Sequence, residues 1–228
     1  MIALVLEAST YAGSVALFRD RTLLGDRSLA MRGRESEALL PAVGELLSQV
    51  GVRVEAIGRI VCGAGPGAFT SLRIAGGIAK GIALAVGAEL VPVSSLALLV
   101  GSLDEVLPGR YLATADALRG QWYAEPFEMS AEGVVRSLGA VRIVERSALE
   151  AWAHSFGGDV IGGGLGGALG GALGAESSAP RARGAARLAT LVEPGGTADL
   201  ASWEPSYGRL AEAQVKWEAE HGRPLARG

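Results

Sequence analysis

The sequence has few of the residues that enzymes use for metal binding and nucleophilic chemistry. Its 228 residues include two histidines, His154 and His221, and one cysteine, Cys62. Neither histidine lies in a His-x-x-x-His or similar helical pattern, so we expect no metal site of the metalloprotease type. A single cysteine excludes an internal disulfide, and its position at the end of an apolar run indicates a buried structural thiol. A Gly-x-Ser-x-Gly nucleophile motif is also absent.

Basic charge is scarce as well. The net charge is −3, whereas a strong nucleic-acid binder needs a concentrated basic surface. The nearest candidates, Arg181, Arg183 and Arg187, lie in a Pro/Ala/Gly-rich stretch that is typical of a solvated loop. Arg73 and Lys80 interrupt the most apolar helix, so no uncharged run reaches the ~18–20 residues of a membrane span. The N-terminus lacks the basic region of a signal sequence. We therefore expect a cytoplasmic protein without membrane contacts.

The first half of the sequence predicts strands and helices in the order β-β-β-α-β-α-β-α. Strands are expected at residues 2–6, 14–18, 22–29, 60–62 and 89–93, and helices at 36–50, 71–86 and from 95 onward. The first helix should start near Ser36, tolerate Pro41 in its early turns and end at Gly51. The last two strands follow helices, so they should lie parallel beside the first. This order is typical of a ribonuclease H-like unit, the building block of the actin-like ATPase fold.

The second half begins again with strands. They are expected at 111–115, 121–127, 133–144 and 160–161, with helices at 147–153, 185–192 and 206–220 and a glycine-rich loop at 157–174. The predicted fold class is therefore α/β, with two tandem halves of which the second is reduced. The expected domains are 1–104 and 105–205, and the C-terminal helix 206–221 should pack back on the first.

The first two helices are candidates for an interface. Three glycines, Gly76, Gly77 and Gly81, lie inside the second helix, and each costs about 1 kcal/mol relative to alanine. Either the helix packs tightly on its own sheet, or it uses one face for the sheet and the other for a partner. The candidate interface residues are Leu39, Leu40, Val43, Leu46, Leu47, Leu72, Arg73, Ile74, Gly76, Gly77, Ile78, Lys80 and Gly81.

Two turns could hold phosphate. The Gly-rich loop 63–70 precedes a helix N-terminus, but it lacks the lysine and Ser/Thr of a P-loop, so it is either an anion site or a plain tight turn. Actin-like ATPases place an Asp at the end of the first strand and a Gly/Ser/Thr-rich hairpin after it. Here Glu7 replaces the Asp, followed by Ser9 and Thr10. These three residues are candidates for a vestigial nucleotide site.

The motifs carry a family resemblance. Residues 65–74 read Gly-Pro-Gly-Ala-Phe-Thr-Ser-Leu-Arg-Ile, which resembles the Gly-Pro-Gly-Ser-Phe-Thr-Gly-Leu-Arg-Ile pattern of the TsaB family. Supporting stretches are 6–10, 39–41, 92–96, 116–123 and 205–209, the last similar to the family's Pro-x-Tyr-x-Arg. The sequence departs from the family at Glu35, where His is frequent, at Ser71, where Gly is usual, and at Leu118, where Arg is usual.

The resemblance implies a non-catalytic scaffold or activator. Proteins like this pair with the catalytic paralogue TsaD and work with the ATPase TsaE to form threonylcarbamoyladenosine at position 37 of ANN-decoding tRNAs. It implies that this chain contacts TsaD through its two helices, holds tRNA only through the complex, and needs no metal or cofactor of its own. A homodimer through the same helices stays open. The alternatives are an ATP-binding phosphotransferase of the same fold, a homodimeric interaction module and, least favoured, a peptidase.

Overall fold

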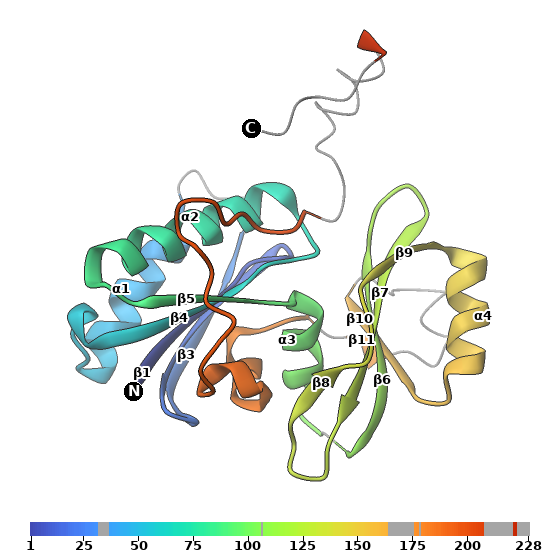
Figure 1. Cartoon of the computed structure of the whole chain (residues 1–228), viewed down its shortest axis with the longest axis horizontal. Coiled ribbons are helices and arrows are strands. Elements are labelled where there is room, and N and C mark those ends of the chain that lie inside the picture. Colours follow the sequence, from blue (N-terminus) through green and yellow to red (C-terminus); the bar gives the residue numbers. More distant parts are fainter. Residues whose placement is uncertain (32–36, 106, 164–175, 178, 208–220, 223–228) are drawn as a thin grey trace.

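The computed structural model describes residues 1–31, 37–105, 107–163, 176–177, 179–207 and 221–222 (Figure 1). Its first sheet is built from β1 (Ile2–Glu7), β2 (Ala12–Arg19), β3 (Thr22–Ala30), β4 (Ile57–Gly63) and β5 (Glu89–Val93). The strand order is β3-β2-β1-β4-β5. β1, β2 and β3 pair antiparallel, and β4 and β5 join β1 in parallel. The predicted order and strand directions of this half are confirmed.

Three helices accompany this sheet: α1 (Leu39–Val50), α2 (Phe69–Val86) and α3 (Ser95–Gly101), with a short 3₁₀ turn η1 (Val54–Ala56). α1 ends at Gly51, whose φ of 66° is left-handed and therefore suits glycine. The predicted cap at Ser36 lies outside the described residues. Within them, the Glu37 carboxylate accepts from the backbone N–H groups of Leu39 and Leu40.

The layers follow from the alternation of side chains along each strand. Leu4 and Leu6 point to the face that α1 and α2 cover, whereas Ala3 and Val5 point to the opposite face. That second face packs on α3, which lies between the two sheets (Figure 1). The described residues are thus stacked in five layers: α1 and α2, the first sheet, α3, the second sheet and α4.

The second sheet has the order β11-β10-β6-β7-β8, and β9 also pairs with β7. Its strands are β6 (Gly109–Asp116), β7 (Gln121–Met129), β8 (Val135–Ser137), β9 (Arg142–Glu145), β10 (Asp159–Gly163) and β11 (Glu176–Ser177). α4 (Arg146–Phe156) covers its outer face through Leu149 and Phe156. Together the two halves form the actin-like ATPase fold, with a second half that is reduced.

One predicted strand is wrong in this half. Residues 133–144 form two short strands, β8 and β9, with a break between Ser137 and Arg142. Opposite the break stands Pro126 of β7, which has no N–H to donate and therefore cannot continue the ladder. The Pro126 carbonyl instead accepts from the N–H of Leu138, 2.8 Å away.

The chain then returns to the first half. Two 3₁₀ turns, η2 (Ala182–Arg187) and η3 (Ala189–Leu191), stand where one helix was predicted at 185–192. We call residues 189–206 the returning segment: the Ala198 N–H donates to the Leu90 carbonyl at the edge of β5, 2.8 Å away. The predicted helix 206–221 falls almost entirely outside the described residues. We propose that the returning segment belongs with the first domain rather than with 105–205.

Candidate functional site

Glu7 is sealed inside the first half. Its side chain is 0% exposed. One carboxylate oxygen accepts from the Ser9 N–H at 2.5 Å and the other from the Ser95 hydroxyl at 2.8 Å. Burial raises the pKa of Glu7, and these hydrogen bonds from Ser9 and Ser95 lower it in part. A Cβ added at Gly63 would overlap the carboxylate, so the backbone of β4 closes the site on that side.

The Gly-rich loop folds over the turn between β1 and β2. The Ala68 N–H donates to the Ser9 carbonyl at 2.7 Å, and a Cβ at Gly67 would overlap the backbone of Ser9. Two further N–H groups, of Ala64 and Gly65, donate within the protein. These groups are therefore occupied, as in a tight structural turn. Thr10, half-buried, donates its hydroxyl proton to the Ala12 carbonyl at 3.0 Å, away from Glu7.

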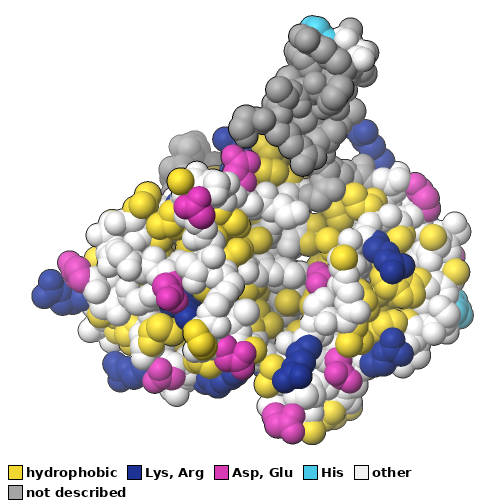
Figure 2. All heavy atoms as spheres, in the orientation of Figure 1, with side chains coloured by type: hydrophobic (Ala, Val, Ile, Leu, Met, Phe, Trp, Pro, Cys, Tyr) yellow, Lys and Arg dark blue, Asp and Glu magenta, His cyan; other side chains and the backbone are white. Residues whose placement is uncertain are grey.

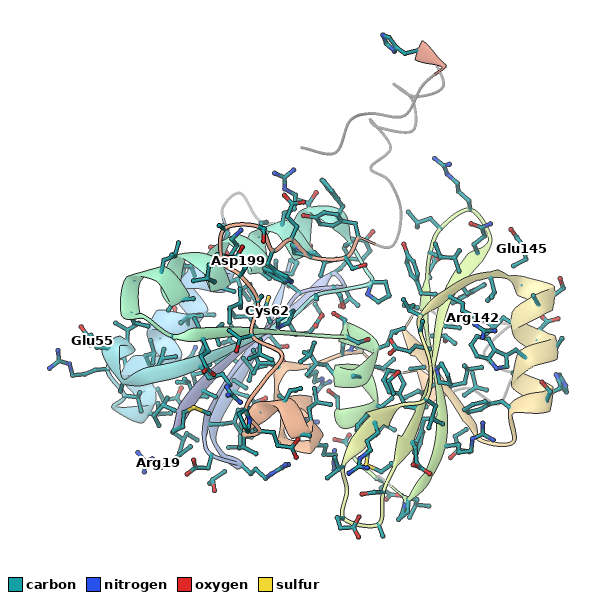
Figure 3. All side chains as sticks on the ribbon, in the orientation of Figure 1. Arg19, Glu55, Cys62, Arg142, Glu145 and Asp199 are labelled. Atoms are coloured by element: carbon teal, nitrogen blue, oxygen red, sulfur yellow. The ribbon has the colours of Figure 1, made fainter. Side chains whose placement is uncertain are left out.

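Cys62 lies inside the first half (Figure 3), and the prediction of a buried thiol is confirmed. Burial raises the pKa of the thiol, and the nearby Glu7 adds to this. The neutral form is therefore favoured, which suits a packing role rather than a nucleophile. Both histidines are exposed. Over the described part of the chain, no three His, Cys, Asp or Glu side chains converge to hold a metal ion.

The predicted interface residues divide into two groups. Those buried in the core of the first half are Leu39, Val43, Leu46, Leu47 and Leu72. Gly76 is also buried, because Pro205 and Trp203 of the returning segment lie against it. Lys80 donates to the Trp203 carbonyl at 3.0 Å, so it too serves the returning segment. Helical spacing had grouped these residues in the sequence, but the structure buries some of them and exposes others.

The second group faces outward. It comprises Leu40, which is 50% exposed, Arg73, Gly77 and Gly81, with Ile74 and Ile78 half-buried beside them. Among the described residues, nothing lies within 4 Å of a Cβ built at Gly77 or Gly81. Figure 2 shows hydrophobic side chains along the upper part of the first half, where α2 lies. These residues are the exposed members of the predicted set on α1 and α2.

Sequence reasoning missed Leu84, which extends this exposed set. It is 68% exposed, the largest exposure of a big apolar side chain on either helix. Gly77, Gly81 and Leu84 are spaced i, i+4 and i+7, so they lie in one row along α2. That spacing was visible in the sequence. We define Gly77, Gly81, Leu84 and Leu40 as the helix face.

α2 is also the one described helix long and apolar enough to cross a membrane by length and composition. Its Ala75, Ala79 and Ala83, however, are fully buried against the first sheet, as in the core helix of an α/β protein. Arg73 and Lys80 add two charges to the same helix. Its apolar character is thus explained by the sheet on one side and the helix face on the other.

Comparisons with known proteins match one family model and several relatives. A family model described as "TsaD: tRNA N6-adenosine threonylcarbamoyltransferase" matches residues 31–143. The tRNA threonylcarbamoyladenosine biosynthesis protein TsaB of Escherichia coli is 33% identical over 135 residues, 59% of this chain and 58% of that protein. TsaB of Haemophilus influenzae is 32% identical over 45% of this chain and 43% of its own length. The matched segments thus span about half the length of these two relatives.

Two further matches extend over nearly the whole chain. TsaB of Bacillus subtilis is 27% identical over 95% of this chain and 98% of its own length. The solved structure "YeaZ from Pseudomonas aeruginosa" superposes with a TM-score of 0.74 and 27% identity over 90% of this chain and 99% of that one. Another structure from that organism, titled as similar to peptidase YEAZ, reaches 0.76 and 28% over 91% and 99%. The sequence motifs, the two-sheet fold and these matches support a protein of the TsaB family.

Proposed function

We propose that this chain is a non-catalytic subunit in the formation of threonylcarbamoyladenosine at position 37 of ANN-decoding tRNAs. It would support a TsaD-type catalytic subunit and work with a TsaE-type ATPase in the cytoplasm. The relatives that match it are named for threonylcarbamoyladenosine biosynthesis. tRNA would be held by the complex, since this chain carries a net charge of −3.

The helix face is the observation that carries this proposal. Gly76 is accounted for within the chain, because the returning segment presses against it. The described part of the chain does not account for Gly77 and Gly81 in this way, because it leaves open space where each Cβ would stand. Each glycine costs about 1 kcal/mol of helix stability relative to alanine, and no contact among the described residues requires its small size. A partner backbone that approaches closely over this row would account for both.

The region around Glu7 supports the non-catalytic role. Its carboxylate is fully buried and both of its oxygens accept hydrogen bonds from the protein's own groups. The Ser9 N–H is spent on Glu7, and the Ser9 carbonyl accepts from Ala68. We infer that Glu7 and Ser9 lock the Gly-rich loop in place, and that the nucleotide chemistry resides in the partner.

The test replaces Gly77 or Gly81 with leucine. Each change fills the open space on the helix face and also favours the helix, so the isolated chain should unfold no more easily. We expect size-exclusion chromatography with multi-angle light scattering to show loss of the complex with the TsaD-type partner. Ala151→Leu, at an exposed position of α4, is the matched control and should leave the complex intact.

Two measurements separate the alternatives. An undiminished complex with both variants would refute the helix face as the docking site. If the isolated variant has a lower mass in solution than the isolated wild type, the wild type forms a homodimer through the helix face. Threonine incorporation into tRNA by the partner proteins should depend on this chain. Equal incorporation without it, together with tight Mg-ATP binding to the isolated chain in calorimetry, would favour the phosphotransferase instead.

A further inference from the structure

A cleft opens between the two halves at the carboxyl ends of β4 and β5. Its volume is about 260 Å³. Its apolar walls come from Pro66, Pro92, Val93 and Val141, and its polar side chains are those of Ser94, Glu125 and Ser206. In open α/β sheets, ligands bind in the crevice outside the carboxyl ends of the strands. The cleft is therefore in a position suited to a ligand, although the Glu7 carboxylate nearby is fully buried.

Glu125 is the chemical feature of this cleft. It comes from β7 and is only 7% exposed. Its carboxylate accepts from the Ser94 hydroxyl at 2.7 Å and from the Ser137 hydroxyl at 3.0 Å. No Lys or Arg among the described residues forms an ion pair with it. Burial raises the pKa of Glu125, and the two serines lower it only in part.

The two serines do not stabilise the anion equally. The Ser94 oxygen accepts from the N–H groups of Leu96 and Ala97, so its single proton is committed to Glu125. Ser137 also has one proton, but it faces two acceptors: Glu125 at 3.0 Å and the Gly139 carbonyl at 2.8 Å. The ionised carboxylate therefore has one committed donor and one shared donor for its four lone-pair sites.

Apart from the exposed Ser206 hydroxyl, the rest of the wall supplies few free donors. Its two prolines have no N–H. The N–H groups of Ala64, Gly65 and Ser206 already donate, to Val93, Ser95 and Ala64 respectively. An anion such as phosphate would meet a carboxylate and these spent N–H groups. A cation with several N–H donors would instead meet a buried carboxylate that lacks them.

We propose that this cleft binds a small organic ammonium ion, whose –NH₃⁺ group donates to Glu125 while its apolar body lies against the prolines and valines. An ammonium group has three donors and no acceptor, which matches the unfilled lone pairs of the carboxylate. The cleft has room for roughly nine water molecules, at about 30 Å³ each, so the ligand is of amino-acid or short-amine size. This site is separate from the helix face and does not depend on the proposed complex.

The test compares propylamine with 1-propanol, which has the same apolar body and no charge. Saturation-transfer NMR on the full chain at pH 8 would follow binding to the wild type, Glu125→Gln and Glu128→Gln. Glu128 lies on the same strand but is exposed, so it controls for the loss of one negative charge. We expect saturable propylamine binding that weakens about tenfold or more in Glu125→Gln and is unchanged in Glu128→Gln.

A variant that leaves Glu125 intact completes the design. Val141 is 39% exposed at the cleft, so Val141→Trp should fill the space without disturbing the core and should abolish binding. Circular dichroism would show that each variant is folded. The proposal is overturned if propylamine does not saturate the wild type, if 1-propanol binds as well, or if Val141→Trp binds as tightly as the wild type.

Discussion

Replacing Arg59 with methionine should loosen the returning segment from the first sheet. Arg59 lies on β4 with only 4% of its side chain exposed. Its guanidinium donates to the carbonyls of Thr190 and Glu193, 3.0 and 2.7 Å away. It also pairs with the Glu89 carboxylate on β5 at 2.8 Å. One side chain thus ties two strands to a segment more than a hundred residues later.

The magnitude follows from these contacts. Glu89 is 51% exposed, so its ion pair is screened by solvent and contributes under about 1 kcal/mol. The two bonds to carbonyls come from a charged donor and contribute about 1.5–3 kcal/mol each, of which methionine restores none. Methionine keeps most of the apolar stem in contact with the sheet. We therefore expect a loss of at least about 3 kcal/mol, or roughly 6–12 °C or more in Tm for a chain of this size.

Urea unfolding followed by circular dichroism would measure this loss, and limited proteolysis would report cleavage within residues 189–206. Arg53→Met is the matched control, because Arg53 is 85% exposed and pairs only with the exposed Glu55. It should leave the unfolding midpoint nearly unchanged. The proposed role of Arg59 in holding the returning segment is refuted by either of two results. One is that Arg59→Met lowers the unfolding free energy no more than Arg53→Met. The other is that the returning segment stays protected from protease.

Two further predictions concern buried carboxyl groups. Gly63→Ala should destabilise the fold by about 1–3 kcal/mol in urea unfolding, because the new Cβ would overlap the fully buried Glu7 carboxylate; a neutral result would mean that this carboxylate can move. Burial raises the pKa of Glu125, so the folded state binds this proton more tightly than the unfolded state does. The stability that results is fully present below the ordinary pKa of 4.5. It is lost as pH rises through the folded-state pKa. The unfolding free energy of wild type relative to Glu125→Gln should therefore fall as pH rises above about 4.5, and a constant difference would contradict the raised pKa.

Much of the first half could be predicted from apolar patterning alone. Its parallel strands are buried on both faces, so they appear as continuous apolar runs, and the fifth strand was placed at its observed bounds of Glu89–Val93. Gly51 ended the first helix as expected, because glycine adopts the left-handed conformation without strain. These signals depend only on residues that are close in the sequence, so a single sequence is enough to detect them.

The site was harder to predict because its contacts are long-range. Helical spacing placed Leu46 and Gly77 on candidate stripes, but it could not say that the sheet covers Leu46 and leaves Gly77 open. Nor could it show that Glu7 is closed by Gly63 and Ser95, which are distant in sequence. Glu125 was passed over because its two serines lie on other elements, and only the fold brings them together.

The hydrogen bond from Ala198 to the edge of β5 has a consequence for how the protein is made. β5 is the outermost strand on its side of the first sheet, and the returning segment covers it from residue 198. During synthesis that edge stays open until almost the entire chain has left the ribosome. A shortened chain ending at residue 104 would present an unpaired parallel strand to its neighbours, a setting that favours aggregation. A segment near residue 198 thus covers the edge of the sheet that the first strand of the chain begins.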